Sequence, residues 1–287
     1  MVDASSFLAI AGAITSQTVL ITGFLYYSGW ARAQATLAYF GLDTSLAGYS
    51  TSDYLLRSVN VTFSPLIRLG LITLILLALH WLVVQRSLKV PAGSRARRLG
   101  RLIVSLTQIA AVALTAAVVT SILLPNQVGR PLGLTLPLLL IASVALLGYV
   151  MYLRATYAEE LSTTPPSHPL AQALVLLTLG LLGTLWAVST YASQVGTQIA
   201  TNLVADLSER SSVVLYSTER LGISGTDVEV AEIAQPGSRY RYQYSGLRLL
   251  THTTDKYLLL PAGWQRGRDR VFVIQDDGSI RIDIAVR

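Results

Sequence analysis

The sequence contains no cysteine, which excludes disulfide bonds, thiolate metal sites and cysteine-based catalysis. Histidine is also scarce: His80, His168 and His252 lie far apart and show no spacing typical of metal ligands. No phosphate-binding glycine loop, dinucleotide fingerprint or serine-hydrolase motif occurs. We therefore expect no enzyme activity, no metal and no cofactor.

Charge is scarce as well. Charged residues make up 13% of the 287 residues, whereas about a quarter is usual in soluble proteins. Residues 1–205 hold only five acidic and eleven basic residues, while residues 206–287 hold eleven of each. This shift predicts an α-helical membrane domain over residues 1–205 and a separate soluble domain over residues 206–287.

Long apolar runs are frequent in the first 205 residues. A helix needs about 20 apolar residues to cross a bilayer. Five runs qualify, at residues 7–27, 69–85, 102–124, 131–153 and 170–191. No acidic or basic residue lies in the middle of a run, and we interpret His80 as a polar group near the inner interface. Five spans are predicted, with four spans plus a re-entrant segment as the alternative.

The basic residues predict the direction of the spans. Six of the eleven basic residues in the membrane domain lie between residues 86 and 101, and loops rich in Lys and Arg stay in the cytoplasm. Alternation then places the N-terminus inside, and residues 31–65 and the C-terminal domain outside. The start, "MVDASS", has no basic segment, so the first span is predicted to be retained in the plasma membrane. The pI near 9.6 thus reflects topology, and we expect no nucleic-acid partner.

The outer segment 31–65 is too apolar for a free linker. The stretch "ARAQATLAYF" predicts that the first helix continues to Phe40 and ends at Gly41. A second short helix is predicted after Ser50, Ser52 or Asp53, with one apolar face made of Leu55, Leu56, Val59 and Phe63. The pair is predicted to lie on the lipid headgroups, or alternatively to form a structured cap. We expect the first of these helices to contact the C-terminal domain.

The C-terminal domain has the alternating pattern of β-strands. Seven short strands are predicted, at residues 211–218, 227–233, 239–244, 246–252, 256–261, 270–275 and 279–286. Asp277-Gly278 predicts a hairpin between the last two. A chain of this length with seven strands predicts a small all-β barrel or two-layer sandwich.

The runs "GWARAQATLAYFGLD", "STSDYLLRSV", "SSVVLYSTERLGISG" and "YQYSGLRLLTHTTDKYLLLPAGW" resemble a family of actinobacterial multi-pass membrane proteins with an extracytoplasmic C-terminal β domain. The resemblance covers most of the chain. It implies a location in a bacterial plasma membrane, and it supplies no activity and no site residues.

Aromatic and arginine residues mark the candidate binding site of the β domain. "RYRYQY" places tyrosines on one face of a strand and arginines on the other, and we favour a buried tyrosine face and a solvated arginine face. Tyrosine and arginine are also enriched at protein interfaces. The predicted partner-binding residues are Tyr240, Tyr242, Trp264, Arg266 and Arg268.

Polar residues inside the spans suggest a second function. Such side chains either join helices or line a pore, and the predicted pore-lining residues are Ser16, Gln17 and Gln108. The first hypothesis is a non-enzymatic membrane protein that presents an extracellular binding or receptor module to a protein ligand. The alternative is a homo-oligomeric ion channel. Self-association in the bilayer is expected in both.

Overall fold

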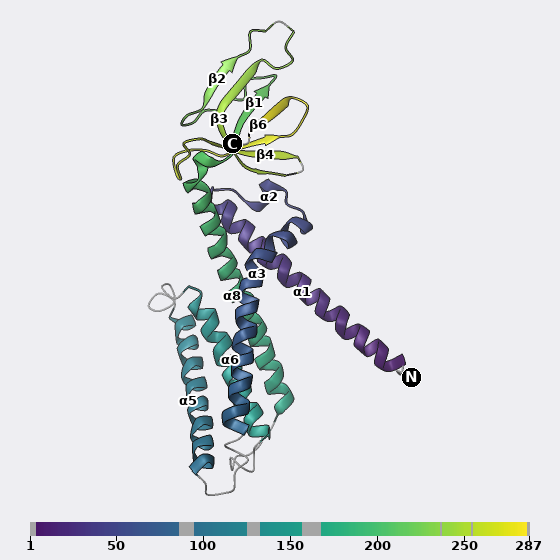
Figure 1. Cartoon of the computed structure of the whole chain (residues 1–287), viewed down its shortest axis with the longest axis vertical. Helices are drawn as coiled ribbons and strands as arrows, with labels where there is room; N and C mark the ends of the chain where they lie inside the picture. Colours follow the sequence, from purple (N-terminus) through teal and green to yellow (C-terminus); the bar gives the residue numbers. More distant parts are fainter. Residues whose placement is uncertain are drawn as a thin grey trace. The chain divides into compact units, whose positions relative to one another are not determined.

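The computed structural model describes residues 4–85, 95–124, 133–156 and 168–285, except Pro236 and Thr254. Only the backbone is described for residues 4–14, 16, 60, 83–85, 95–97, 99 and 100. Helices predominate, and the C-terminal residues form an antiparallel sheet (Figure 1). The chain divides into two compact units, one made of residues 1–58 and 192–287 and the other of residues 59–191.

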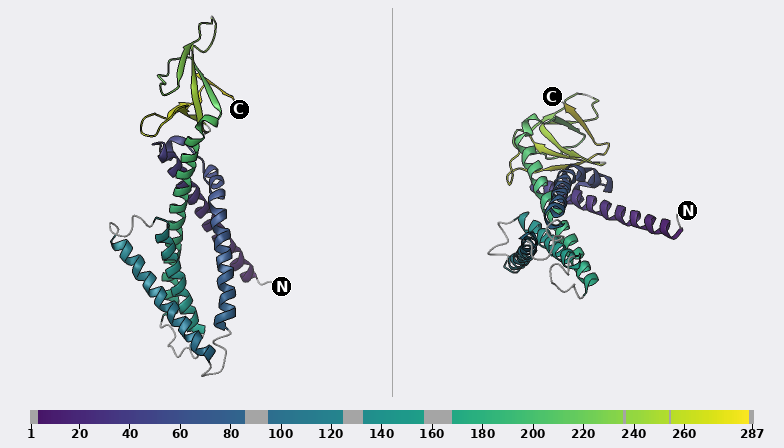
Figure 2. Two further views of the ribbon diagram at one scale, coloured as in Figure 1. Left: turned by 60° about the vertical axis from the view of Figure 1, so that its left-hand side comes forward. Right: turned by 60° about the horizontal axis from the view of Figure 1, so that its bottom comes forward.

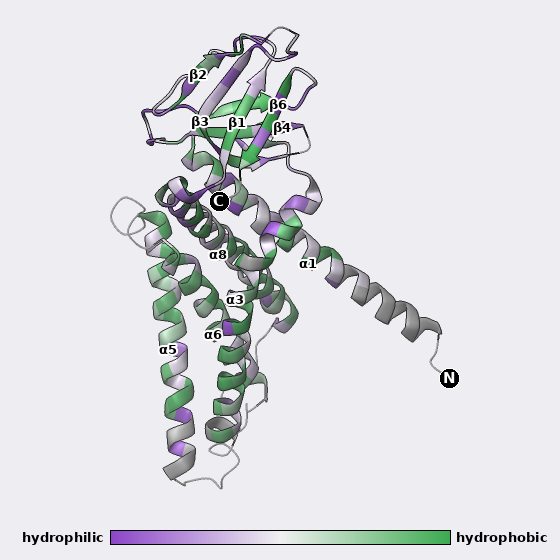
Figure 3. Cartoon of the chain, turned by 45° about the horizontal axis from the view of Figure 1, so that its top comes forward, coloured by the Kyte–Doolittle hydropathy of each residue, from purple (hydrophilic) through white to green (hydrophobic). Residues whose placement is uncertain are grey.

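The unit of residues 59–191 contains four long helical segments. They are the larger part of α3 (Thr51–Leu79) with its π-helical end (His80–Gln85), α5 (Arg95–Leu123), α6 (Thr135–Thr156) and the first part of α8 (Pro169–Ala205). Hydrophobic residues run along all four helices (Figure 3). The part of the chain that the structure describes therefore has four helices long and apolar enough to cross a membrane. These helices indicate a membrane protein.

Helix α6 packs against α5, approaches α8 closely and contacts the π-helical segment that follows α3. The Thr115 and Ser143 hydroxyls hydrogen bond at 2.9 Å between α5 and α6. On the α8 side, a side-chain carbon at Gly183 would lie 3.2 Å from Ile141, so the missing side chain lets α6 approach closely. Small and hydroxyl residues therefore lie where α6 meets α5 and α8.

Five spans were predicted, whereas the described residues contain four candidate membrane helices, and the first predicted span is not among them. The four candidate helices cover Val61–Leu82, Arg101–Leu123, Thr135–Thr156 and Pro169–Ala205. The second span was predicted to begin at residue 69, and its longer extent places the exposed Arg68 inside the candidate helix. The predicted basic loop 86–101 lies outside the described residues up to residue 94, and Arg95 begins α5.

The first predicted span lies in α1 (Ala4–Tyr39), which belongs to the other unit. The helix continues well past residue 27, as the apolar pattern after Arg32 predicts. It ends in a Schellman motif: the Gly41 amide donates to Ala38 and the Leu42 amide donates to Leu37. Gly41 has φ 75°, so a glycine suits this position.

Helix α3 begins with a capping box. The Ser50 hydroxyl accepts the amide of Asp53, and the Asp53 carboxylate accepts the amide of Ser50 at 2.9 Å. The sequence left three candidates for this cap, and the structure selects Ser50. The predicted separate short helix is wrong, because α3 continues from Thr51 into the apolar span. Pro65 lies within it without ending it.

The short helix α2 (Thr44–Ala47) lies between α1 and α3. Where α1 meets α3, a side-chain carbon at Gly29 would lie only 1.8 Å from the Tyr54 carbonyl oxygen. The two helices therefore come into backbone contact at Gly29. The outer segment is a packed structure in which Ala31, Ala33 and Leu37 are buried.

The sheet contains six antiparallel strands. They are β1 (Ser212–Ser217), β2 (Glu229–Glu232), β3 (Tyr242–His252), β4 (Lys256–Pro261), β5 (Phe272–Gln275) and β6 (Ile280–Ala285). The order is β5-β4-β3-β1-β6, and β2 also pairs with β3. A short 3-10 turn, Leu207–Glu209, connects α8 to β1. The sheet is seen from two further directions in Figure 2.

The predicted third and fourth strands are a single strand, β3. Gly246, predicted to separate them, lies at a bulge where the pairing of β1 with β3 shifts register. Its φ is 75°, and a side-chain carbon there would lie 1.7 Å from the Asp227 carbonyl oxygen. The glycine thus bends the strand without ending it, which a linear pattern does not distinguish from a turn.

The predicted hairpin of the last two strands is wrong. Asp277 and Gly278 do form a turn, but β5 pairs with β4 and β6 pairs with β1, at opposite ends of the strand order. Both strands nevertheless contribute side chains to one inner cluster, so the sheet curls around it. The buried members of this cluster are Val213, Leu215, Ile223, Tyr244, Leu247, Leu259 and Ile280.

Candidate functional site

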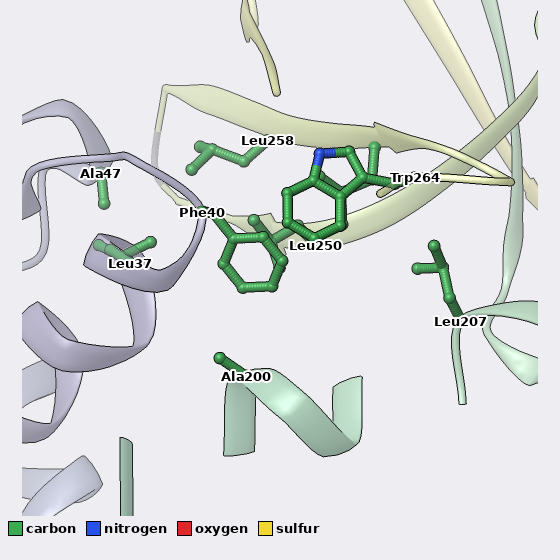
Figure 4. Close-up of a cluster of buried hydrophobic side chains, with 9 residues drawn as sticks. Leu37, Phe40, Ala47, Ala200, Leu207, Leu250, Leu258 and Trp264 are labelled. Carbon is green, nitrogen blue, oxygen red and sulfur yellow. The ribbon is translucent and has the colours of Figure 1, made fainter. Parts of the chain in front are cut away.

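A second apolar cluster attaches the sheet to helices of the same unit. We call it the helix–sheet cluster, and its buried members are Leu37, Phe40, Ala47, Ala200, Leu207, Leu250, Leu258, Leu260 and Trp264. Figure 4 shows Phe40, from the end of α1, between Trp264, in the loop after β4, and Ala200 of α8. The expected contact between the outer segment and the β domain is therefore present.

Strand β4 explains how one sheet supports two clusters. Alternate residues of a strand point to opposite faces. Leu259 belongs to the inner cluster, whereas Leu258 and Leu260 belong to the helix–sheet cluster, and all three are fully buried. A continuous leucine run is typical of a strand covered on both faces. The helix–sheet cluster combines residues from both sides of position 205.

The predicted partner-binding residues lie in different environments. Trp264 is 5% exposed, with its ring centroid 5.1 Å from that of Phe40, so its indole packs inside the unit. Tyr242 packs on the inner cluster. Arg266 is exposed and its guanidinium lies 4.4 Å from the ring centroid of Tyr39, next to the helix–sheet cluster. Arg268 is exposed.

Tyr240 belongs to a surface that the sequence pattern did not assemble. We call it the Tyr–Arg face, made of Tyr216, Arg239, Tyr240 and Arg281. The two tyrosine rings lie 6.3 Å apart. Arg239 lies 5.7 Å from the ring centroid of Tyr240, and Arg281 lies 5.7 Å from that of Tyr216. The face therefore consists of two adjacent rings, each with a guanidinium beside it.

The backbone positions these side chains. Val213 and Leu215 point into the inner cluster, so Tyr216 projects from the opposite face of β1. The register pairs Tyr216 with Arg281 across β1 and β6. Arg239 lies before β3 and donates to the Gly278 carbonyl in the turn before β6. Residues more than sixty positions apart thus meet, and no local signal in the sequence predicts the pairing.

The Tyr–Arg face carries two guanidiniums, and one of them, Arg281, is paired with a carboxylate. Arg281 forms two hydrogen bonds with Asp283, at 2.9 and 3.1 Å, and these bonds and the carboxylate charge raise the pKa of Arg281. Among the residues that the structure describes, no carboxylate forms an ion pair with Arg239 or with the neighbouring exposed Arg241. An acidic group has charge partners on this surface.

The predicted pore-lining residues do not share one environment. The Ser16 side chain lies outside the described residues. Gln17 is exposed on α1, whereas the Gln108 amide oxygen accepts a hydrogen bond from Arg154 at 2.7 Å, between α5 and α6. The structure thus uses Gln108 to join two helices of one unit.

His80 lies at the start of the π-helical end of α3. Its Nδ1 is 2.8 Å from the Tyr149 hydroxyl of α6, and its ring contacts both Tyr149 and Tyr152. A hydrogen bond between two helices satisfies the polar ring nitrogen within the unit. The described residues contain no group of three metal ligands.

Comparison with known proteins identifies no relative: no family model, curated protein or solved structure matches the chain.

Proposed function

We propose that this chain is a non-enzymatic receptor of the plasma membrane whose extracytoplasmic sheet binds an acidic protein ligand. The Tyr–Arg face carries the proposal, because its two rings and adjacent guanidiniums occupy one outward surface. Tyrosine and arginine are prominent among residues that dominate protein–protein binding energy. Trp264 is buried in the helix–sheet cluster and the Arg266 guanidinium lies against Tyr39 beside it, so neither is part of the Tyr–Arg face. Arg268 hydrogen bonds to Gln265 in the loop after β4 and is not included either.

Attachment of the sheet to the helices supports a receptor. The helix–sheet cluster packs β4 on the ends of α1 and α8, so the sheet does not hang from a free linker. The Thr36 hydroxyl of α1 lies 3.1 Å from the Gly196 carbonyl of α8 and fixes the two helix ends to each other. A ligand bound to the Tyr–Arg face therefore binds a sheet that is packed on the ends of α1 and α8.

The arrangement of the helices supports the proposed sidedness. Residues 28–57 pack with the end of α8 and the sheet in one unit, which supports a shared side of the membrane for these parts. The four candidate helices between them would return the chain to that side. The basic segment 86–101 argues that this side is extracytoplasmic, with α1 as the fifth span.

Labelling of single introduced cysteines tests which side of the membrane each segment faces. The chain has no cysteine of its own, so any label on this protein reports the introduced residue. We expect an impermeant thiol reagent added to whole cells to label Ser279→Cys and not Ser94→Cys. The reverse pattern contradicts the proposed topology.

Ligand binding is tested with the full-length protein in lipid nanodiscs and a fluorescent polyglutamate peptide as an acidic probe. We expect the double variant Arg239→Gln, Arg281→Gln to weaken binding by about tenfold or more, as expected when charge-assisted hydrogen bonds are lost. The matched variant Arg266→Gln, Arg268→Gln removes two arginines from the same domain and should bind normally. Equal binding by the first variant and the unchanged chain refutes the Tyr–Arg face.

A pore is the second candidate, and Gln17 favours it. Its amide is exposed at the centre of the first predicted span, where an unpaired polar group is unfavourable in lipid. Self-association through α1 would supply a polar partner or a water-filled axis. Bilayer conductance by the purified protein that disappears in Gln17→Leu would support the pore. Absence of conductance in the unchanged chain would leave the receptor as the proposal.

A further inference from the structure

Two arginines that no predicted site includes meet where α1 contacts α3. Arg32 follows the first predicted span by five residues, and Arg57 precedes the Val61–Leu82 candidate span by four. The Arg32 Nη1 donates to the Arg57 carbonyl at 2.6 Å. Both side chains are partly buried. The contact thus lies close to one end of the first predicted span and to one end of the Val61–Leu82 helix.

The Asp53 carboxylate, one helical turn before Arg57, interacts with the Arg57 charge, but no described carboxylate lies within ion-pair distance of either guanidinium. Burial and the adjacent charge of Arg57 lower the pKa of Arg32. Asp43 and Asp53 are the only acidic residues between positions 28 and 58, and each accepts hydrogen bonds from a serine at a helix start. No acidic or basic residue occurs between positions 192 and 205 of α8. Within the described part of the chain, neither arginine forms an ion pair.

Aromatic side chains lie beside Arg57. The Arg57 guanidinium lies 4.1 Å from the ring centroid of Tyr49. Tyr49 contacts Tyr54 edge-on, and Tyr54 contacts Tyr26 in the same way, with centroids 5.9 and 5.3 Å apart. A guanidinium stacked on a ring keeps its N–H groups free at the edge, in the geometry that suits a phosphate.

The part of α1 before Arg32 indicates that a phosphate bound by these arginines belongs to a lipid. Val19, Leu20 and Ile21 are about two-thirds exposed, and they are followed by the partly exposed rings of Tyr26 and Trp30. Aromatic residues that follow an apolar helix surface are typical of the membrane interface. Arg32 comes directly after this belt. The site therefore lies at headgroup level, where a phospholipid presents its phosphate.

We propose that Arg32, Arg57 and Tyr49 form a binding site for the phosphate of an anionic phospholipid in the outer leaflet. The two guanidiniums would bind the phosphate oxygens and relieve their mutual repulsion. A zwitterionic choline headgroup would bring a cation beside two arginines, so phosphatidylglycerol is expected to bind in preference to phosphatidylcholine. The site is separate from the Tyr–Arg face, and its loss would leave polyglutamate binding unchanged.

The test is native mass spectrometry of the purified full-length protein offered equal amounts of phosphatidylglycerol and phosphatidylcholine. We expect the unchanged protein to retain phosphatidylglycerol selectively. Arg57→Gln should lower that selectivity about tenfold, the loss expected for one charge-assisted hydrogen bond. The matched control is Arg266→Gln, which also removes a guanidinium stacked on a tyrosine and should leave the selectivity unchanged.

Tyr49→Leu removes the ring beside Arg57 while both charges remain, and it should also lower the selectivity for phosphatidylglycerol. This variant tests the site if the Arg57→Gln protein does not fold. Unchanged selectivity in a folded Arg57→Gln protein, or an equal loss in Arg266→Gln, overturns the site. Excess inorganic phosphate should not release the lipid. Release by phosphate would instead assign the site to a free oxyanion and overturn the lipid.

Discussion

Replacement of Phe40 by alanine tests whether the helix–sheet cluster holds the sheet on the helices. The Phe40 side chain is 7% exposed and contacts the rings of Tyr39 and Trp264, with centroids 5.4 and 5.1 Å away. Truncation of a buried phenylalanine to alanine costs about 3–5 kcal/mol. A loss of about 3 kcal/mol corresponds to a change of more than a hundredfold in an equilibrium constant. We expect opening of the helix–sheet contact to become more frequent by that factor.

Hydrogen exchange of the full-length protein in nanodiscs measures this opening segment by segment. Exchange should accelerate at the end of α1, in α2 and in β4, because these elements surround Phe40. Exchange in β1 should change little, because its buried residues Val213 and Leu215 belong to the inner cluster. The two clusters thus give an internal comparison within one experiment.

Phe63→Ala provides the matched control, since the Phe63 side chain is 64% exposed on α3. It removes the same atoms and should leave the exchange of α2 and β4 unchanged. Unaltered exchange around Phe40 in the Phe40→Ala protein would refute the structural role of the cluster. So would uniform acceleration throughout the sheet, because it would show that the two clusters open together.

Three further predictions concern single residues, each measured by thermal unfolding of the full-length protein. Gly246→Ala should lower the free energy of unfolding by more than about 2 kcal/mol, because it adds a clash with the Asp227 carbonyl to the 1–2 kcal/mol of left-handed backbone strain. Gly222 has φ 63° and open space around it, so Gly222→Ala should show the strain alone. Equal losses of stability in the two variants would contradict the close approach at Gly246. The hydrogen bonds from Ser50 lower the pKa of Asp53, so the stabilisation by the ionised Asp53 carboxylate should be complete above the ordinary pKa of 3.8 and disappear as the pH falls through the lower pKa of the folded protein. Asp53→Asn, which keeps a hydrogen-bond acceptor at this position, should lose this part of the pH dependence of stability. An identical acid profile in the variant would refute the capping box. Gln108→Leu should cost about 1.5–3 kcal/mol by removing the acceptor of the Arg154 guanidinium; unchanged stability would show that the bond does not join α5 and α6.

The sequence alone identified the helices and strands with local signals. Apolar runs located the four candidate membrane helices, and the pattern after Arg32 predicted that α1 reaches Phe40. Gly41 was recognisable as a helix end because left-handed backbone is accessible to glycine without strain. Alternation located β1, β2, β4, β5 and β6 within a few residues of their observed bounds. Each of these features depends on neighbours in the chain, which a linear pattern contains.

Only the tertiary structure decided which elements meet. Whether Gly246 bends a strand or ends it depends on β1, and whether β6 pairs with β5 depends on the curl of the sheet. Burial of Trp264 follows from Phe40, more than two hundred residues earlier. The Tyr–Arg face and the Arg32–Arg57 pair likewise combine side chains from separate elements. Hydrophobic packing and strand register act between distant residues, so the order of amino acids indicates which side chains are available and the fold determines their partners.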